Sequence, residues 1–108
     1  MEKTSINDLK KLILQMAKEK GWGVKPEDIN VGEKIALVHT EVSEAFEAYR
    51  QGNIDNRHGF KEELADALMR ILHLAGIFDI NLEKEVIKKL EINKDRKWNY
   101  KKLNEKGK

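Results

Sequence analysis

The segment that most constrains the fold of this chain is residues 67–78, ALMRILHLAGIF, which is apolar at nearly every position. A helix with apolar side chains around its whole circumference must be covered on all sides. The chain has 108 residues, and a chain of this length buries only a modest fraction of its surface alone. We therefore predict that copies of the chain associate as a homodimer or homotetramer, with helix packing as the interface.

The rest of the sequence also favours helices. Charged residues make up 37% of the chain and there is one proline, a composition typical of long solvated helices rather than of a β-sandwich or barrel. Apolar periodicity and capping residues predict four helices, at about residues 5–19, 31–51, 60–78 and 82–95. We predict a single all-α domain over residues 1–108, with a four-helix, antiparallel, bundle-like core and a flexible tail from about residue 97.

The composition also restricts the partners of the chain. The net charge is only +2, although basic residues crowd the C-terminal end, so nucleic acid is not expected as a partner. Because cysteine is absent, a bound metal would need oxygen or imidazole ligands. The sequence has neither an apolar run typical of a signal peptide nor the roughly 20 apolar residues of a membrane span. We therefore expect a cytoplasmic protein that does not contact a membrane.

Two carboxylate pairs interrupt the apolar faces of the second and third predicted helices. Glu41 and Glu44 are three residues apart, which places them on one face of a helix together with several apolar residues. Glu63 and Asp66 repeat this spacing on the third helix. A short loop makes the two helices antiparallel neighbours. The sequence therefore predicts that four carboxylates from two helices converge.

Burial of such carboxylates is costly unless a countercharge compensates for it. Arg70 and Lys34 are candidate countercharges, and a divalent cation is the alternative. Four hard oxygen ligands suit Mg²⁺, with Mn²⁺ as a substitute. A single E-x-x-E on a helix usually belongs to a solvated face with salt bridges. Two pairs of equal spacing, each within an apolar face, form a far more specific pattern.

At these positions the sequence resembles the all-α nucleoside triphosphate pyrophosphohydrolases, the superfamily that includes MazG-like proteins and dimeric dUTPases. The superfamily motif, E-x-x-E followed by a spacer and E-x-x-D, is matched by Glu41-Val-Ser-Glu44 and Glu63-Leu-Ala-Asp66. The flanking sequences ALVHTEVSEAFEAYR and FKEELADALMRILHLAG are similar as well. The resemblance covers about residues 31–96, which is most of the chain.

The resemblance implies that Glu41, Glu44, Glu63 and Asp66 are Mg²⁺ ligands. It also implies hydrolysis of the α–β phosphoanhydride of an NTP or dNTP, which yields the monophosphate and pyrophosphate. Metal ions would offset the repulsion between carboxylates and triphosphate and lower the pKa of an attacking water. Glu41 or Glu44 would be catalytic by orienting or deprotonating that water, and the spacing leaves open which of them does so.

The phosphates of the substrate also need cationic or amide partners. Lys89, Asn93 and Arg96 follow a K-x-x-x-N-x-x-R spacing at the end of the fourth helix. Similar endings contact phosphate in relatives, so these residues are candidate phosphate ligands. A solvated helix end favoured by the helix dipole is the alternative interpretation.

The nucleobase needs a binding surface, and aromatic rings stack on bases. The candidates for this base pocket are Trp22, His39 and Tyr49, with Trp98 in the tail as a further ring. Simple packing is the competing interpretation for Trp22. We expect His73 to be a buried histidine with a hydrogen-bond partner and Arg70 to form a salt bridge.

Other functions stay open on the sequence alone. Phosphoribosyl-ATP pyrophosphohydrolase belongs to the same superfamily and is an alternative activity. A non-enzymatic helical oligomer that binds metal and nucleotide is a second alternative. A nucleic-acid binder that uses the basic tail is a third, which the acidic pairs disfavour.

Overall fold

The computed structural model describes residues 4–96, and within them it contains helices and no strand. The predicted all-α class is therefore confirmed for this part of the chain. The elements are α1 (Ile6–Lys20), a short 3₁₀ turn η1 (Pro26–Asp28), α2 (Val31–Arg50), α3 (Phe60–Ile77) and α4 (Leu82–Asp95). Each helix begins and ends within one residue of its predicted bounds. The predicted tail from about residue 97 and the candidate Trp98 lie outside the described residues.

Local side-chain chemistry explains where the helices begin and end. Ser5 and Asp8 form a capping box at the start of α1, and its hydrogen bonds to Ser5 lower the pKa of Asp8. Asn30 and Asn81 accept hydrogen bonds from backbone amides in the first turns of α2 and α4. Gly21 ends α1 with a φ of 74°, a left-handed conformation that glycine adopts without a steric penalty.

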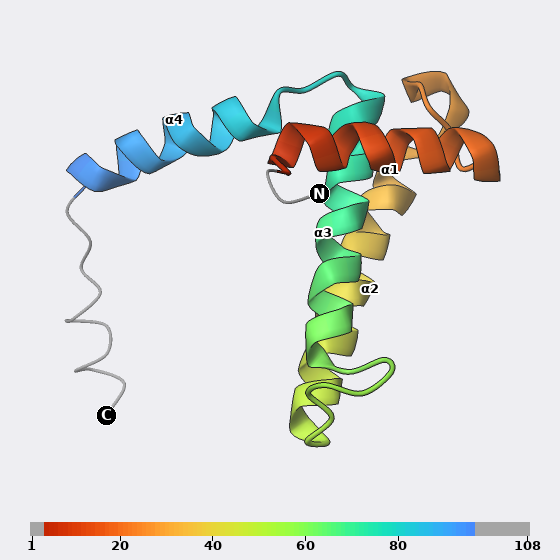
Figure 1. Ribbon diagram of the computed structural model, residues 1–108, viewed down its shortest axis with the longest axis vertical. Coiled ribbons are helices and arrows are strands. Elements are labelled where there is room, and N and C mark those ends of the chain that lie inside the picture. The colour runs from red at the N-terminus through yellow and green to blue at the C-terminus, as the bar shows by residue number, and fades with distance from the viewer. Residues whose placement is uncertain (1–3, 97–108) are drawn as a thin grey trace.

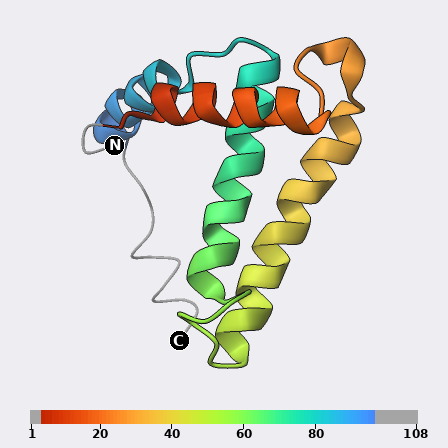
Figure 2. The same cartoon turned by 45° about the vertical axis from the view of Figure 1, so that its right-hand side comes forward.

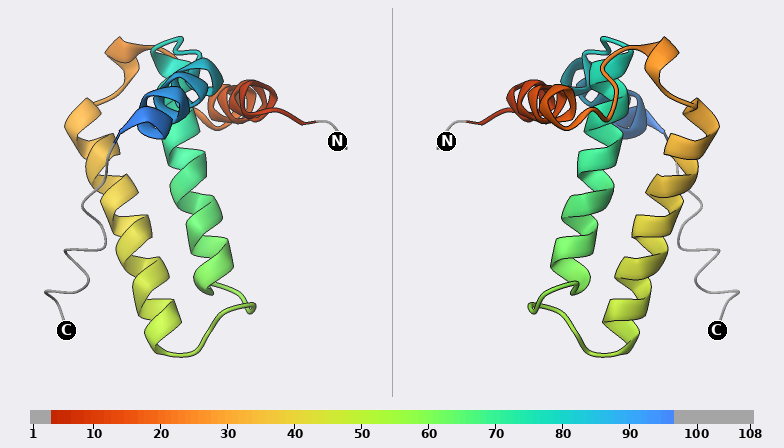
Figure 3. Two further views of the ribbon diagram at one scale, coloured as in Figure 1. Left: turned by 90° about the vertical axis from the view of Figure 1, so that its left-hand side faces the viewer. Right: turned by 90° about the vertical axis from the view of Figure 1, so that its right-hand side faces the viewer.

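The centre of the fold is an antiparallel hairpin of α2 and α3, joined by the loop of residues 51–59 (Figure 1). α1 crosses this hairpin near the end that lies away from the loop (Figure 2). α4 leaves the same end of α3 and runs away from the hairpin rather than along it (Figure 1), and it is therefore foreshortened in the side views of Figure 3. The helix packing is consistent with a bundle, and most of it involves α1, α2 and α3.

α1 approaches α3 closely because α3 carries a glycine at the crossing. A Cβ atom on Gly76 would lie 3.2 Å from Leu14 Cδ1, which is tighter than an ordinary van der Waals contact, so a larger residue would require the Leu14 side chain to shift. Ile13 and Ala17 of α1 are buried in this contact region. α4 is held mainly at its first turn, where Glu83 accepts a hydrogen bond from the Ile6 amide at 3.1 Å.

The core of the described chain is small and rich in alanine. Its buried apolar side chains are Ile13, Ala17, Ala45, Ala48, Ala67, Leu72, Ala75 and Ile77. Small residues let α2 and α3 approach closely, but they remove little apolar surface from water. Many larger apolar side chains, including those of Phe46, Leu68 and Leu90, are exposed instead.

Nine of the exposed apolar side chains lie along the side of α2 and α3 that does not hold α1. We call this set the outer apolar face; it consists of Val31, Ile35, Val42, Phe46, Tyr49, Leu64, Leu68, Ile71 and Phe78. The spacing of three, four and seven residues places these side chains along one side of each helix. A groove lies within the face, between Ile35 of α2 and Ile71 of α3. Association of copies, which this face would suit, stays a prediction.

None of the helices in residues 4–96 is long and apolar enough to cross a membrane.

Candidate metal centre

Three carboxylates from the α2–α3 hairpin lie close together. One ligand oxygen from each of Glu41, Glu44 and Glu63 can be chosen so that all three atoms are within 4.8 Å of one another. Glu41 and Glu63 are buried, whereas Glu44 is exposed at the edge of the group. The antiparallel packing of α2 and α3 produces this convergence, because each helix presents its E-x-x-E/D pair toward the other.

Glu63 carries the strongest electrostatic perturbation in the group. Only 4% of its surface is exposed, and this burial is the largest cause that raises its pKa to about 7. The neighbouring carboxyl groups of Glu41, Glu44 and Asp66 raise the pKa further. Its Oε2 atom is buried without a hydrogen-bond partner. Binding of a cation or a proton would therefore stabilise the Glu63 carboxyl group.

Asp66 lies one helical turn after Glu63, outside the group of three. Burial is the largest cause that raises its pKa; the charges of Glu41, Glu62 and Glu44 add to the effect, and Arg70 opposes it. Asp66 and Glu41 line the same pocket. All four predicted carboxylates are thus in one region, with three of them in direct proximity.

Arg70 is the strongest countercharge in this region. Its Nε donates a hydrogen bond to Glu41 Oε1 at 2.9 Å, which confirms the predicted salt bridge and identifies its partner. His58, which was not predicted, lies 3.8 Å from Glu63 through its Nδ1. Within residues 4–96, neither Glu44 nor Asp66 forms an ion pair with a Lys or Arg side chain. The cluster therefore has more negative than positive charge.

The donor set can be compared with the needs of a divalent cation. Carboxylate oxygens are the ligands that Mg²⁺ and Mn²⁺ prefer, and such ions keep several positions for water or phosphate. A cation placed among Glu41, Glu44 and Glu63 would supply a partner for the buried Oε2 of Glu63. It would also relieve the repulsion that raises the pKa of this carboxyl. The residues present therefore fit a hard divalent cation.

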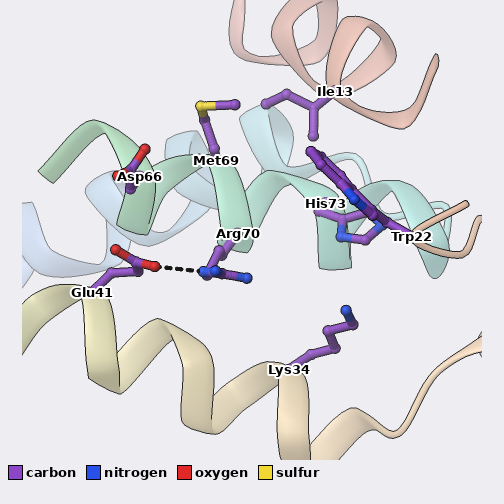
Figure 4. A pocket seen from close by; sticks show the side chains of 8 residues that line it. All are labelled: Ile13, Trp22, Lys34, Glu41, Asp66, Met69, Arg70 and His73. Atoms are coloured by element: carbon purple, nitrogen blue, oxygen red, sulfur yellow. Dashed lines mark hydrogen bonds and ion pairs between the residues drawn. The ribbon is translucent and has the colours of Figure 1, made fainter. Parts of the chain in front are cut away.

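A pocket of about 380 Å³ adjoins the carboxylates and continues toward α1. Its lining residues are Ile13, Trp22, Lys34, Glu41, Asp66, Met69, Arg70 and His73. Figure 4 shows Glu41 and Asp66 at one end, Arg70 in the middle, and Trp22 with His73 at the other end. Lys34 points from α2 into the space between Arg70 and the rings (Figure 4). The pocket thus has an acidic end and an aromatic end.

The aromatic end is held in place by a buried histidine. His73 Nε2 donates a hydrogen bond to the Gly23 carbonyl at 2.9 Å, as predicted for a satisfied buried histidine. This bond ties α3 to the loop that carries Trp22, and the Trp22 and His73 rings meet edge to face with centroids 6.5 Å apart. Trp22 is therefore both a packed ring and a wall of the pocket.

The other two base-pocket candidates lie elsewhere. His39 lines the apolar groove of the outer apolar face, and Tyr49 is exposed with its ring 5.6 Å from that of Phe60. Neither residue lines the pocket that contains Glu41 and Asp66. Of the three rings, only Trp22 lines the pocket that contains Glu41 and Asp66.

The structure also places the three phosphate candidates at a distance from the carboxylates. Lys89, Asn93 and Arg96 belong to α4 or its C-terminal cap, and α4 runs away from the α2–α3 hairpin (Figure 1). None of them lines the pocket beside Glu41. Within a single chain, these residues are not brought to the site.

Lys34 lines this pocket, whereas the sequence predicted it only as a possible countercharge for the carboxylates. It precedes Glu41 by seven residues, or two helical turns, which places both on the same side of α2. That spacing was a usable signal for a pocket residue. His58 gave no such signal, because it lies in an irregular loop with a φ of 61°.

Comparison of the chain with family models, with curated proteins and with solved structures found no match in any of the three.

Proposed function

We propose that the protein is a Mg²⁺-dependent nucleoside triphosphate pyrophosphohydrolase of the all-α superfamily that its E-x-x-E and E-x-x-D motifs resemble. The substrate is an NTP or dNTP, and the products are the monophosphate and pyrophosphate. Mn²⁺ substitutes for Mg²⁺. The proposal names Glu41, Glu44, Glu63 and Asp66 as metal ligands.

One observation carries the proposal more than any other. Glu63 is buried, has an unpartnered Oε2, and lies within 4.8 Å of ligand oxygens on Glu41 and Glu44. A structural ion-pair network would have placed cations beside these groups, because buried unpaired carboxylates destabilise a fold. Here Arg70 reaches Glu41 alone. An arrangement that lowers stability is typical of a functional site.

In the proposed reaction, the metal, Glu44 and Arg70 have different roles. A bound divalent cation would supply charge neutralisation for the triphosphate and an acidified water. Glu44 is the exposed member of the group, and in this proposal it accepts a proton from the attacking water. Arg70 holds Glu41 in position through its 2.9 Å hydrogen bond and presents the rest of its guanidinium group to the pocket. The pocket beyond Arg70 accepts the nucleoside.

The proposal includes a homodimer or homotetramer. The outer apolar face is too extensive for a typical solvated surface, since large contiguous apolar patches on soluble proteins mark contact sites. A second α2–α3 hairpin packed on this face would complete a four-helix bundle. Association would also let α4 of one copy approach the carboxylates of another. Lys89, Asn93 and Arg96 would then contact phosphates across the interface.

Pyrophosphate release from a panel of NTPs and dNTPs tests the proposed activity. We expect turnover with Mg²⁺ or Mn²⁺ and none with EDTA. Glu44→Gln should lower turnover by about 100-fold or more, whereas Glu47→Gln, which changes an exposed carboxylate one turn further along α2, should leave it intact. Metal-dependent nucleotide binding without pyrophosphate release from any substrate would instead favour a non-enzymatic binding protein. Phosphoribosyl-ATP should be assayed beside the panel, and pyrophosphate release from this substrate alone would favour a phosphoribosyl-ATP pyrophosphohydrolase.

A further inference from the structure

The aromatic end of the pocket has a chemical bias that bears on the substrate. The pocket as a whole is lined by four charged side chains. Two of them, Glu41 and Asp66, are the carboxylates of the acidic end, and the other two are the Lys34 ammonium and the Arg70 guanidinium. Both groups only donate hydrogen bonds. Arg70 uses its Nε for Glu41 and lies in the middle of the pocket (Figure 4). Lys34 lies between Arg70 and the rings, so its donors are the charged donors nearer the aromatic end (Figure 4).

Lys34 is held in an unusual setting for a lysine. It is half-buried on α2, and within residues 4–96 it has no hydrogen bond to a side chain and no ion pair. Its side chain points into the pocket rather than along the helix surface (Figure 4). The three N–H donors of its ammonium group are therefore not used by the described part of the protein. A ligand atom that accepts hydrogen bonds would supply a partner for them.

Lys34 lies on the side of Arg70 that faces the aromatic end of the pocket (Figure 4). It precedes Glu41 by two helical turns, about 10 Å along the axis of α2. Phosphates bound at the carboxylate group would place the nucleoside along the pocket, toward Trp22 and His73 (Figure 4). The indole of Trp22 offers a surface on which a base can stack. Lys34 then faces an edge of that base.

We propose that Lys34 is a specificity-determining residue that selects nucleotides whose base carries a carbonyl oxygen at C4 of a pyrimidine or C6 of a purine, the keto bases, over those that carry an amino group at that position. The proposal rests on the proposed function, since it deepens the substrate class of the same site. At that position a carbonyl oxygen accepts a hydrogen bond from the ammonium group, whereas an exocyclic amino group is itself a donor and offers Lys34 no acceptor. Uracil, thymine, hypoxanthine and guanine belong to the favoured class; cytosine and adenine belong to the disfavoured one.

Matched substrate pairs test this selection. dUTP and dCTP differ in a carbonyl or amino group at one ring position, and ITP and ATP differ in the same way. We expect kcat/KM for the keto member of each pair to exceed that of the amino member by about tenfold to 100-fold, the range for one hydrogen bond to a charged group. Equal values within both pairs, or a preference for the amino members, would overturn the proposal.

The variant Lys34→Met keeps the length of the side chain and removes its donors. We expect it to erase the preference mainly through a higher KM for the keto substrates, with kcat at saturation retained, because contact with the base is made before and during the reaction. Lys11→Met, at an exposed position on α1, is the matched control and should keep the preference. An equal loss of kcat/KM for all four substrates would assign Lys34 to phosphate binding and overturn the proposal.

A binding measurement separates this inference from the proposed activity. Trp22 fluorescence, titrated with dUMP and with dCMP in the presence of Mg²⁺, reports on occupancy of the pocket without turnover; Trp22→Phe identifies the signal from this ring. Tighter binding of dUMP that is lost in Lys34→Met would support the selection even if no substrate released pyrophosphate. Equal affinities for the two nucleotides would overturn it even in an active enzyme.

Discussion

Arg70 donates a hydrogen bond from Nε to Oε1 of Glu41 at 2.9 Å and thereby joins α3 to α2 at the boundary between the carboxylate cluster and the pocket. About two fifths of the Arg70 side chain is exposed, at 39%, against 10% for Glu41. The guanidinium group therefore reaches solvent and pocket while it compensates a nearly buried carboxylate. This pair gives the cluster its only short contact with a Lys or Arg group in residues 4–96.

Replacement of Arg70 by Gln should destabilise the metal-free protein. The substitution leaves Glu41 buried among Glu44 and Glu63 without its cation, and a buried group left unpaired costs about 1–3 kcal/mol. Mg²⁺ should restore part of this loss, because a cation in the cluster would compensate Glu41. Urea unfolding of the wild type, Arg70→Gln and Arg70→Lys, each with EDTA and with Mg²⁺, measures both effects. An Arg70→Gln variant as stable as the wild type without metal would contradict the prediction.

Glu44→Gln and Asp66→Asn should separate activity from stability. Each substitution keeps the size of the side chain and removes one negative charge from a region with an excess of them. Activity should fall by about 100-fold or more, because charge neutralisation at the metal centre contributes several kcal/mol to such reactions. Stability without metal should stay equal or rise, since like-charge repulsion is relaxed. Thermal melts measure the stability of each variant, and a pyrophosphate-release assay measures its activity. Variants that are less stable than the wild type but retain normal turnover when folded would contradict the prediction.

The raised pKa of Glu63 should make the stability of the metal-free protein depend on pH. Its pKa rises from an ordinary value of 4.5 to about 7 in the folded protein, so the folded state binds more protons than the unfolded state in this interval. Stability should therefore be greatest below about pH 4.5, as far as this group is concerned, and should decrease as the pH rises toward 7. Thermal melts in EDTA across this interval measure the slope.

Glu63→Gln provides the control for the pH dependence. The amide does not titrate, so the variant should lose most of the slope and be the more stable protein above pH 7 without metal. Saturating Mg²⁺ should also flatten the slope in the wild type, because a bound cation favours the ionised carboxylate. An unchanged slope in Glu63→Gln would assign the pH dependence to other groups.

The helices and the carboxylate cluster were predictable because they depend on local periodicity. Capping by Ser5 and Asn81 is visible in the sequence, and the three-residue spacing of Glu41 and Glu44 places both on one side of α2 regardless of tertiary structure. An antiparallel hairpin then leaves few ways to orient two such pairs. Convergence of the carboxylates thus followed from spacing and a short loop.

The contents of the pocket and the course of α4 were not predictable in the same way. Trp22 reaches the site through a loop whose path depends on the hydrogen bond between His73 and the Gly23 carbonyl, a contact between residues 50 positions apart. The direction of α4 depends on the turn at Asp79, which has a φ of 53°. Periodicity specifies the face of a helix but not where the next helix goes, so Lys89 could not be placed relative to the carboxylates.

Charged substitutions on the outer apolar face should weaken self-association of the chain. Phe46 and Leu68 lie on this face and are exposed by 60% and 47%. Burial of such side chains stabilises an interface by about 1.5–3 kcal/mol each, and a charge placed among them would have to be desolvated without a partner. Phe46→Glu and Leu68→Glu should therefore weaken association without disturbing the fold, because neither side chain belongs to the buried core.

Sedimentation velocity at micromolar concentration, with circular dichroism as a check on folding, measures this effect. The wild type should sediment as a dimer or tetramer, and both variants should sediment as smaller species with unchanged helix content. Leu90→Glu, on α4 and exposed by 61%, is the matched control for a charge introduced outside the outer apolar face. If it alone dissociates the assembly, the interface lies on α4 rather than on the α2–α3 hairpin. A wild type that is monomeric at these concentrations would show that the outer apolar face is not a self-association surface.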